Sequence, residues 1–331
     1  MPAHGVGGLV KAQLYCVENL DPVTTARKLL QDLWQSAELD GLYIPARMDR
    51  SNIPKGELFD DPSQLEFADP FAPIMPINQA PFALQALRDQ PKRHLGVFLR
   101  PCEWRTFQVL ISQSGEHFHN LFAISADCMG AMDQQEFERL TERDPRGLTR
   151  RALHFASQGG ILSSRQQSSC QLCEDPIPGD VDLQFDFFGV PTDEQLILNF
   201  KDPRVAQAVS EQNASIEVPK DMLERRTRVL QDLARWRSSS FEKRKAQLGS
   251  DALSIEGLTA HLQSCESCRV ALRKYCPTVN VELLTTQSDA AIDQLWDWLM
   301  SCSGCGVCDK DCPEEYPLFG VIFSLRSMDR Q

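Results

Sequence analysis

The sequence lacks the features that mark membrane and secreted proteins. It contains no run of about 18 apolar residues, so a membrane-spanning helix is not expected. The opening residues, MPAHGVGGLVKAQLY, include no continuous apolar segment of the kind found in secretory signals, and they carry no twin-arginine signal. These absences favour a cytoplasmic location.

Positive charge is also scarce. Lys and Arg number 34 against 46 Asp and Glu, which gives a net charge of −12 and an isoelectric point near 5.0. Because such a balance repels phosphate backbones, nucleic-acid binding is not expected. Phosphate-binding loops, dinucleotide fingerprints and the short motifs of zinc proteases and serine hydrolases are absent as well.

Cysteine, in contrast, is abundant, with 12 residues in the chain. Disulfides are not expected in a reducing compartment. Three Cys-x2-Cys pairs occur, at Cys170/Cys173, Cys265/Cys268 and Cys302/Cys305. Clustered thiols of this kind in an intracellular protein favour metal binding. Cys16 follows a short apolar strand and is expected to lie in the core.

The strongest motif is SCSGCGVCDKDCP at residues 301–313. Its spacing is the C-x2-C-x2-C-x3-C-P run of bacterial [4Fe-4S] ferredoxins, formed by Cys302, Cys305, Cys308, Cys312 and Pro313. Gly304 and Gly306 would let the backbone approach a cluster closely. Zinc is the weaker alternative, because zinc ligands usually come as two separated pairs.

A partner motif is expected, because the fourth cysteine of this run binds the other cluster in two-cluster ferredoxins. The candidate is CESCRVALRKYCP, with Cys265, Cys268 and Cys276, but Ala271 stands where a third cysteine would complete it. Three interpretations stay open: a [3Fe-4S] cluster, a cluster with a non-cysteine ligand such as His261, or zinc bound by His261 and the three cysteines.

If the crossover holds, ligands are exchanged between the two motifs. Cys312 would then belong with Cys265 and Cys268, and Cys276 would complete the group of Cys302.

Four further cysteines are dispersed. Cys102 and Cys128 follow two apolar, strand-like segments, HLGVFLR and HNLFAISADC. Since parallel strands bring their carboxyl ends to one edge of a sheet, these two thiols could converge. The Cys170/Cys173 loop would then complete a four-thiolate site. The alternative is two buried structural cysteines and a chance pair.

The pattern of elements predicts an α/β (α+β) domain followed by a helix and a small cluster-binding domain. Helix TTARKLLQDLWQSAEL, strand GLYIPA, a loop at residues 46–80 and strands VDLQFDFFGV and EQLILNF fall in the α/β domain, residues 1–215. Residues 219–248 show apolar spacing typical of a long amphipathic helix, within a linker at residues 216–250. Residues 251–331 are expected to form a ferredoxin-like iron–sulfur domain.

Three segments, GVFLRPCEWRTFQVL, LFAISADCMGAM and SSCQLCEDPIPGDVDLQFDFFGV, resemble the beta subunit family of deazaflavin-coenzyme-reducing hydrogenases and related formate dehydrogenases. The matching residues are Pro101, Cys102, Glu103, Cys128, Met129, Cys170, Cys173 and Asp175. The resemblance implies that the four cysteines among them hold one [4Fe-4S] cluster. Formate-dehydrogenase-type members also carry a C-terminal ferredoxin segment, in the order seen here.

The resemblance implies FAD, but the residues that bind it in the family differ here. Members have an Asp-Gly-Gly turn before the first helix and glycines after an acidic strand. This chain reads ENLDPVTTARKLL and FFGVPTDEQLILNF there, so Pro22 replaces a glycine and only Gly189 remains. Proline adds a Cβ and lacks an N–H, which obstructs a pyrophosphate. FAD is therefore possible but not expected, and no flavin site is assigned.

The expected function is that of an iron–sulfur electron-transfer subunit with two [4Fe-4S] clusters and a possible third. Its partner would be a catalytic subunit, such as a formate dehydrogenase, hydrogenase or heterodisulfide-reductase-like protein, or another electron carrier. One alternative is an FAD-containing oxidoreductase that reduces a substrate or coenzyme directly. Another is a zinc-stabilised interaction protein.

Overall fold

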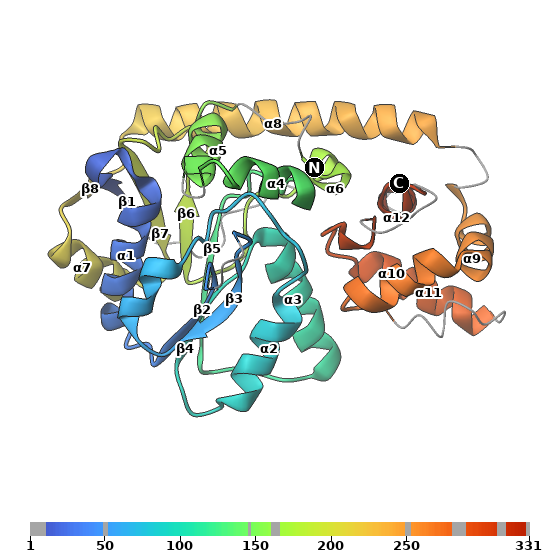
Figure 1. Ribbon diagram of the computed structural model, residues 1–331, viewed down its shortest axis with the longest axis horizontal. Helices are drawn as coiled ribbons and strands as arrows, with labels where there is room; N and C mark the ends of the chain where they lie inside the picture. The colour runs from blue at the N-terminus through green and yellow to red at the C-terminus, as the bar shows by residue number, and fades with distance from the viewer. Residues whose placement is uncertain are drawn as a thin grey trace.

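The computed structural model describes residues 11–48, 52–144, 147–159, 166–248, 253–279, 289–309 and 316–328. They form an α/β part built on one sheet, a long helix and a C-terminal group of helices (Figure 1). Within these ranges, no helix combines the length and the apolar character needed to cross a membrane.

The sheet has eight strands in the order β3-β2-β4-β5-β6-β7-β1-β8. Their bounds are β1 Lys11–Cys16, β2 Gly41–Ala46, β3 Lys55–Phe59, β4 Leu95–Phe98, β5 Leu121–Ala126, β6 Leu183–Asp186, β7 Gln195–Phe200 and β8 Ser215–Glu217. Strands β2, β4, β5 and β6 run parallel, and the remaining neighbours are antiparallel. Parallel strands are covered on both faces, which is why β4 and β5 read as continuous apolar runs.

Helices connect the strands and cover the sheet. Those of the α/β part are α1 Pro22–Ser36, α2 Ala80–Asp89, α3 Pro101–Ser114, α4 Gln134–Thr141, α5 Gly147–Ser157, α6 Ser168–Leu172 and α7 Pro203–Gln212. The expected first helix is confirmed. It begins at Pro22, and the Asp21 carboxylate caps it by accepting the N–H groups of Val23 and Thr24, each at 3.1 Å.

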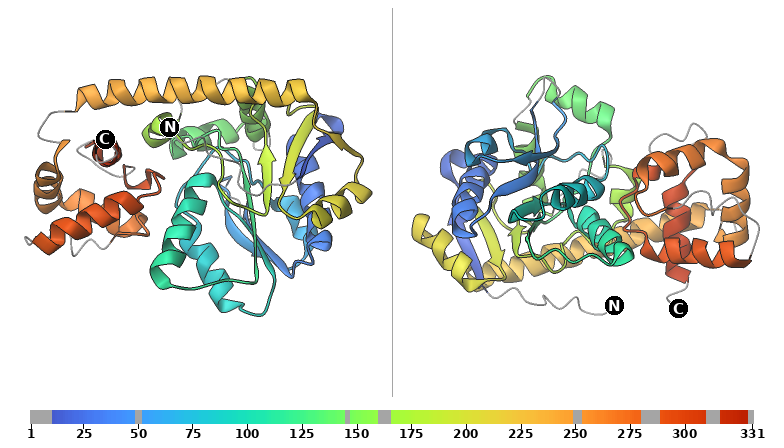
Figure 2. Two further views of the ribbon diagram at one scale, coloured as in Figure 1. Left: turned by 180° about the vertical axis from the view of Figure 1, so that it is seen from behind. Right: turned by 90° about the horizontal axis from the view of Figure 1, so that it is seen from below.

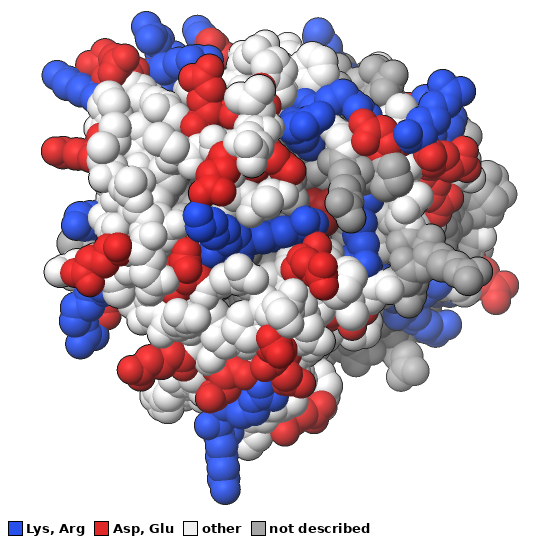
Figure 3. Space-filling view, turned by 60° about the vertical axis from the view of Figure 1, so that its left-hand side comes forward, with Lys and Arg blue, Asp and Glu red and all other residues white. Residues whose placement is uncertain are grey.

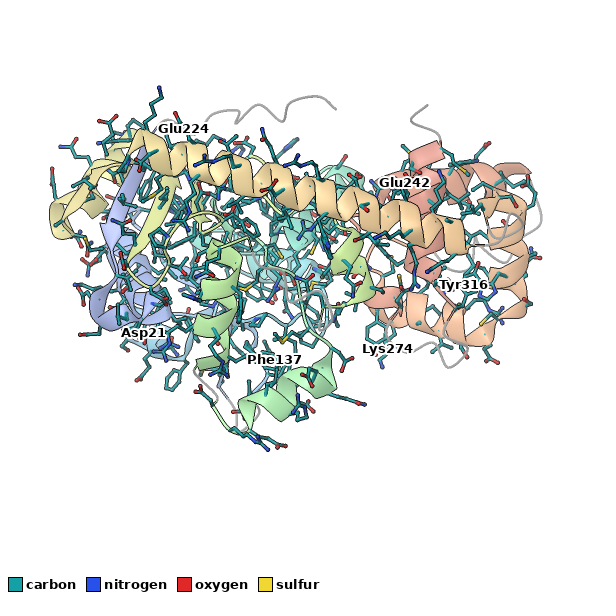
Figure 4. All side chains as sticks on the ribbon, turned by 90° about the horizontal axis from the view of Figure 1, so that it is seen from above. Asp21, Phe137, Glu224, Glu242, Lys274 and Tyr316 are labelled. Atoms are coloured by element: carbon teal, nitrogen blue, oxygen red, sulfur yellow. The ribbon has the colours of Figure 1, made fainter. Side chains whose placement is uncertain are left out.

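Helix α8 (Lys220–Gln247) is the long helix expected from residues 219–248. At a rise of 1.5 Å per residue its 28 residues extend about 42 Å. It passes over both the sheet and the C-terminal helices, as two further views show (Figure 2). Glu224 lies on its stretch above the sheet and Glu242 on its stretch beside the C-terminal helices (Figure 4).

The C-terminal region is helical in the part of the chain that the structure describes. It consists of α9 Ile255–Ser264, α10 Glu266–Tyr275, α11 Asp289–Ser301, the short 3-10 helix η6 Val307–Asp309 and α12 Leu318–Met328. These elements share a core that includes Leu258, Leu272 and Leu299. The structure thus shows a helical C-terminal region, while a ferredoxin-like domain is not shown.

Two local expectations are corrected. Residues 46–80 are not only loop, because β3 pairs with β2 and the 3-10 helix η2 (Pro62–Phe67) follows it. Cys16 is exposed rather than buried in the core, because it is the last residue of β1, where burial along the strand ends. The predicted division into three units at residues 215 and 250 stays a prediction.

Candidate metal centre

The first group of thiols lies at the carboxyl ends of two parallel strands. Chain leaving β4 enters α3 with Cys102 as its second residue, and chain leaving β5 reaches Cys128 after one aspartate. Cys170 lies in α6 and Cys173 directly follows it. The amide of Cys128 donates to the Pro176 carbonyl at 2.7 Å, which ties the second strand end to the loop after Cys173.

These four cysteines, named the sheet set, lie within electrostatic reach of one another. Burial raises the pKa of Cys102 well above its usual value, and the neighbouring Cys128 raises it further. Burial likewise raises the pKa of Cys170 to about 11, with Cys128 and Cys173 adding to the shift. Thiols that raise one another's pKa in this way lie near one another. A metal bound among them would favour their thiolate form.

Arginines surround the sheet set. The guanidinium of Arg100 donates to the Ile74 carbonyl at 2.6 Å and also to that of Ala72. This brings Met75 beside the site, with its Sδ 3.8 Å from the Sγ of Cys102. Arg105 donates to the Asp175 carbonyl at 3.1 Å. Burial opposes the charge of Arg105, but Cys173 and Cys102 outweigh it and its pKa is raised.

A second group, named the C-terminal set, consists of Cys276, Cys302, Cys305 and Cys308. Burial raises the pKa of Cys302 to about 12, and Cys276 and Cys305 raise it further. Cys276 also raises the pKa of Cys305 and Cys308, in each case after the larger effect of burial. The thiol of Cys276 therefore lies near the other three thiols, while the exchange of ligands between the two motifs stays a prediction.

The two sets meet where the C-terminal region contacts the α/β part. Cys305 contributes to the raised pKa of Cys102, and both side chains pack in one layer with Met75 and the fully buried Val307. Hydrogen bonds flank this layer. Arg105 Nε donates to the Ser303 carbonyl at 3.3 Å, and the hydroxyls of Thr106 and Ser303 lie 2.7 Å apart.

A third group, named the His261 set, lies in α9 and α10. One ligand atom each from His261, Cys265 and Cys268 falls within 4.8 Å of the others, which is a spacing that could hold a metal ion. The ring of Tyr316 stacks on His261 at 3.4 Å between centroids. Burial lowers the pKa of His261, which favours the neutral ring that a metal requires. Cys312, the predicted further ligand, lies outside the described residues.

The residues present fit iron–sulfur clusters in the two four-cysteine sets. Each set offers four thiols, which are the donor type that such clusters use. Positive groups lie beside both sets, and Arg326 donates to the Cys302 carbonyl at 2.7 Å and lowers the pKa of Cys302 against the effect of burial.

The residues at the place implied for flavin do not fit it. The Asp21 carboxylate already accepts the N–H groups of Val23 and Thr24 that open α1, so they are not available to a phosphate. At Gly189, an added Cβ would lie 2.7 Å from the Cα of Arg226, because α8 packs directly on that glycine.

Sequence reasoning missed the arginines that face the site from α8. Arg226 and Arg237 are buried on this otherwise solvated helix. Their separation of 11 residues corresponds to about three helical turns, so both lie on one face. That spacing was present in the sequence, but arginine in a charged helix is normally read as exposed.

No model of a known protein family matches the sequence, and no curated protein matches it. Among solved structures ten chains match, including one from the F420-reducing [NiFe] hydrogenase complex of Methanosarcina barkeri, determined as a xenon derivative. That match has a TM-score of 0.52 at 14% sequence identity and covers 73% of this chain and 94% of the other.

At this level of identity the comparison establishes a shared fold. The resemblance to hydrogenase subunits that act on a deazaflavin coenzyme is thereby confirmed in structure, for a chain of such a complex.

Proposed function

We propose that this chain is an iron–sulfur electron-transfer subunit of a larger redox complex. The observation that carries the proposal is the proximity of the sheet set and the C-terminal set, since Cys102 and Cys305 pack against the same buried residues and lie within electrostatic reach of each other. Electron tunnelling weakens steeply with distance, so two redox groups this near to each other form one path through the chain. The residue ranges 1–215, 216–250 and 251–331 serve as its proposed units, the last being ferredoxin-like in its cysteine motif.

When bound, a [4Fe-4S] cluster in each set supplies reversible one-electron transfer. The chain's own residues hold the clusters and shield them. Thr106, Ser303 and Arg105 join α3 to the cysteine loop of the C-terminal set, so the relative position of the two sets is constrained. Val307 and Met75 exclude water from the layer between them, which influences the reduction potential.

The proposed partner is a catalytic oxidoreductase subunit or a second electron carrier. The structure similar in fold comes from a multisubunit hydrogenase complex, which supports a role as one subunit among several. Acidic and basic side chains alternate on the face shown in Figure 3, without a continuous positive surface there. That face gives no support to nucleic acid as the partner.

Two assignments compete for the His261 set. A cluster with one histidine ligand would extend the electron path toward α9, whereas zinc would only stabilise the fold. The half-buried imidazole and the two thiols suit either metal. Metal analysis separates the two, because zinc carries no acid-labile sulfide.

The test is anaerobic reconstitution of the full chain, followed by measurement of iron, acid-labile sulfide, zinc and flavin. Two cubane clusters require about eight irons per chain, at four irons each. A lower value would contradict the proposal, and bound flavin would favour the alternative of an oxidoreductase that acts on a substrate directly. Zinc without sulfide would favour an interaction protein.

Single substitutions connect the iron to the two sets. Cys128→Ser and Cys276→Ser should each lower the iron content by about half, since each removes one ligand of a different four-cysteine set. Cys16→Ser is the matched control, because Cys16 is exposed and belongs to none of the sets. Equal iron content in Cys276→Ser and Cys16→Ser would contradict the grouping of Cys276 with Cys302.

A further inference from the structure

Helix α8 buries only a narrow face, and that face is unusual. Its buried residues are Arg226, Leu233, Arg237 and Phe241. They recur at helical spacing, as expected for the face that packs on the rest of the protein. Two of the four are arginines, although arginine is rarely buried without a partner.

Arg226 has its partners in the protein. It donates to both carboxylate oxygens of Asp127, one of them at 2.8 Å, and its Nε lies 3.0 Å from Asp186. These contacts join α8 to the carboxyl ends of β5 and β6. Arg226 therefore shows how this helix accommodates a buried guanidinium when the protein itself supplies the anions.

Arg237 is buried more deeply and is not accommodated in this way. Its side chain is 2% exposed, and within the described part of the chain its Nε and Nη1 have no hydrogen-bond partner. A buried cation without an anion is strongly unfavourable. The two nitrogen atoms therefore call for a hydrogen-bond acceptor that the described residues do not supply.

The place where Arg237 lies indicates that partner. Helix α8 packs on α6, which carries Cys170 of the sheet set, and Phe241, one turn after Arg237 on the same buried face, packs with Leu172 of α6. Arg237 thus lies within electrostatic reach of Cys170. The hydroxyl of Ser169, next to Cys170, is also buried and lacks a partner among the described residues. Each of the two packed helices thus buries a polar side chain that has no partner for some of its atoms among the described residues.

We propose that Arg237 is a positioning residue for the anionic group held by the sheet set, and that its N–H groups donate to the sulfur atoms of that group. This inference rests on the proposed function. A cluster bound by four thiolates is an anion, and the gain of one electron makes it more negative without forming or breaking a bond. A buried positive charge beside it favours the reduced form and raises the reduction potential.

The experiment compares reduction potentials of the reconstituted full-length chain with Arg237→Met and Arg237→Lys. Electron paramagnetic resonance (EPR) follows each cluster during an anaerobic redox titration, and the sheet-set cluster is the one whose signal Cys128→Ser removes. Arg235→Met is the matched control, because Arg235 lies on the same helix but is 79% exposed and paired with Asp232.

In Arg237→Met, the ratio of reduced to oxidised sheet-set cluster at a fixed potential should fall about tenfold, which corresponds to 59 mV for a one-electron couple. In Arg237→Lys, which keeps the charge, this ratio should fall less. In Arg235→Met it should equal that of the unmodified chain. The potential of the C-terminal set should stay unchanged in all three.

The outcomes separate this inference from the proposed function. An unchanged potential in an Arg237→Met chain that retains its iron overturns the role of Arg237 and leaves the electron-transfer function standing. If Arg237→Met fails to bind iron, Arg237→Lys serves as the test instead. An unaltered reduction potential together with faster loss of iron in Arg237→Lys would show that Arg237 has only a structural role. An unmodified chain that binds no iron and sulfide overturns both proposals.

Discussion

Asp186 is a single residue that binds an arginine of α8 near the site, while the burial of its charged carboxylate lowers the free energy of unfolding. It lies at the end of β6, beside Asp127 and within reach of the guanidinium of Arg226. Burial raises the pKa of Asp186 to about 6, Arg226 acts against that shift, and Asp127 adds to it. One arginine thus serves two buried carboxylates, and the second is only partly compensated.

The pH dependence of stability should reveal this competition. Folded Asp186 keeps its proton up to about pH 6, whereas in the unfolded chain it loses the proton near its ordinary value of 3.8. Its contribution to the free energy of unfolding is therefore largest below about pH 4 and falls as the pH rises through about 6.

We expect the free energy of unfolding of the unmodified chain, relative to Asp186→Asn, to fall by ~1–3 kcal/mol from about pH 4 to about pH 7. Urea unfolding of both proteins at matched metal content measures this difference. A difference that stays constant over the range, or that grows with pH, would show that Asp186 ionises normally in the folded chain.

The decisive element for the position of the C-terminal set is the short loop between Cys302 and Cys308. Gly304 and Gly306 both adopt positive φ, at +74° and +67°. They differ in surroundings. A Cβ on Gly304 would meet only the Phe319 ring at 3.9 Å, whereas one on Gly306 would lie 2.0 Å from the Cβ of Ser169. The loop therefore docks on α6 through a position that only glycine permits.

Alanine substitutions should separate the two glycines. Gly304→Ala should cost only the backbone strain of ~1–2 kcal/mol. Gly306→Ala should cost a further ~1–3 kcal/mol from the collision with Ser169. Urea unfolding measures both, and Ser169→Gly should restore most of the second cost in a Gly306→Ala/Ser169→Gly protein. Equal losses for the two alanine variants, or no rescue, would argue against close docking.

Helix α8 is the second element that joins the parts of the molecule. Its sequence is dominated by charge, which favoured a solvated helix with one docked face. The structure places Arg226 of that face against the sheet and Phe241 against the C-terminal helices, where its ring lies 5.1 Å from that of Phe323. A single helix thus contacts both parts, which helps to hold the two cysteine sets in contact.

At the scale of the whole molecule, the main feature is that two four-cysteine sets from distant parts of the chain share one buried layer. Cys102 and Cys305 lie in that layer with Val307 and Met75. Two paramagnetic groups in such proximity interact magnetically. The molecule is therefore expected to behave as one coupled redox unit rather than as two independent ones.

EPR of the fully reduced chain tests this coupling. Its spectrum should differ from the sum of the spectra of Cys128→Ser and Cys302→Ser, each of which retains one of the two clusters. Cys16→Ser should give the spectrum of the unmodified chain, because Cys16 is remote from both sets in sequence and exposed. A spectrum equal to the simple sum would show that the two groups are too far apart to interact.

Local patterns accounted for much of the fold. Apolar runs predicted the strands that precede Cys102 and Cys128. The Asp21-Pro22 pair predicted the start of α1, and helical periodicity predicted the extent of α8. Each of these depends on residues that are close in the chain, so the amino acids alone specify them. The same holds for the spacing of the cysteine motifs, which by itself indicated iron–sulfur chemistry.

Only the tertiary structure decided that the two four-cysteine sets lie near each other and what surrounds them. Cys305 packs in the same cluster as Cys102, and Arg237 is buried within electrostatic reach of Cys170. These contacts join positions far apart in the chain, and they depend on how α6, α8 and the cysteine loop pack. Packing is set by shape and burial over the whole molecule, which no short stretch of sequence encodes.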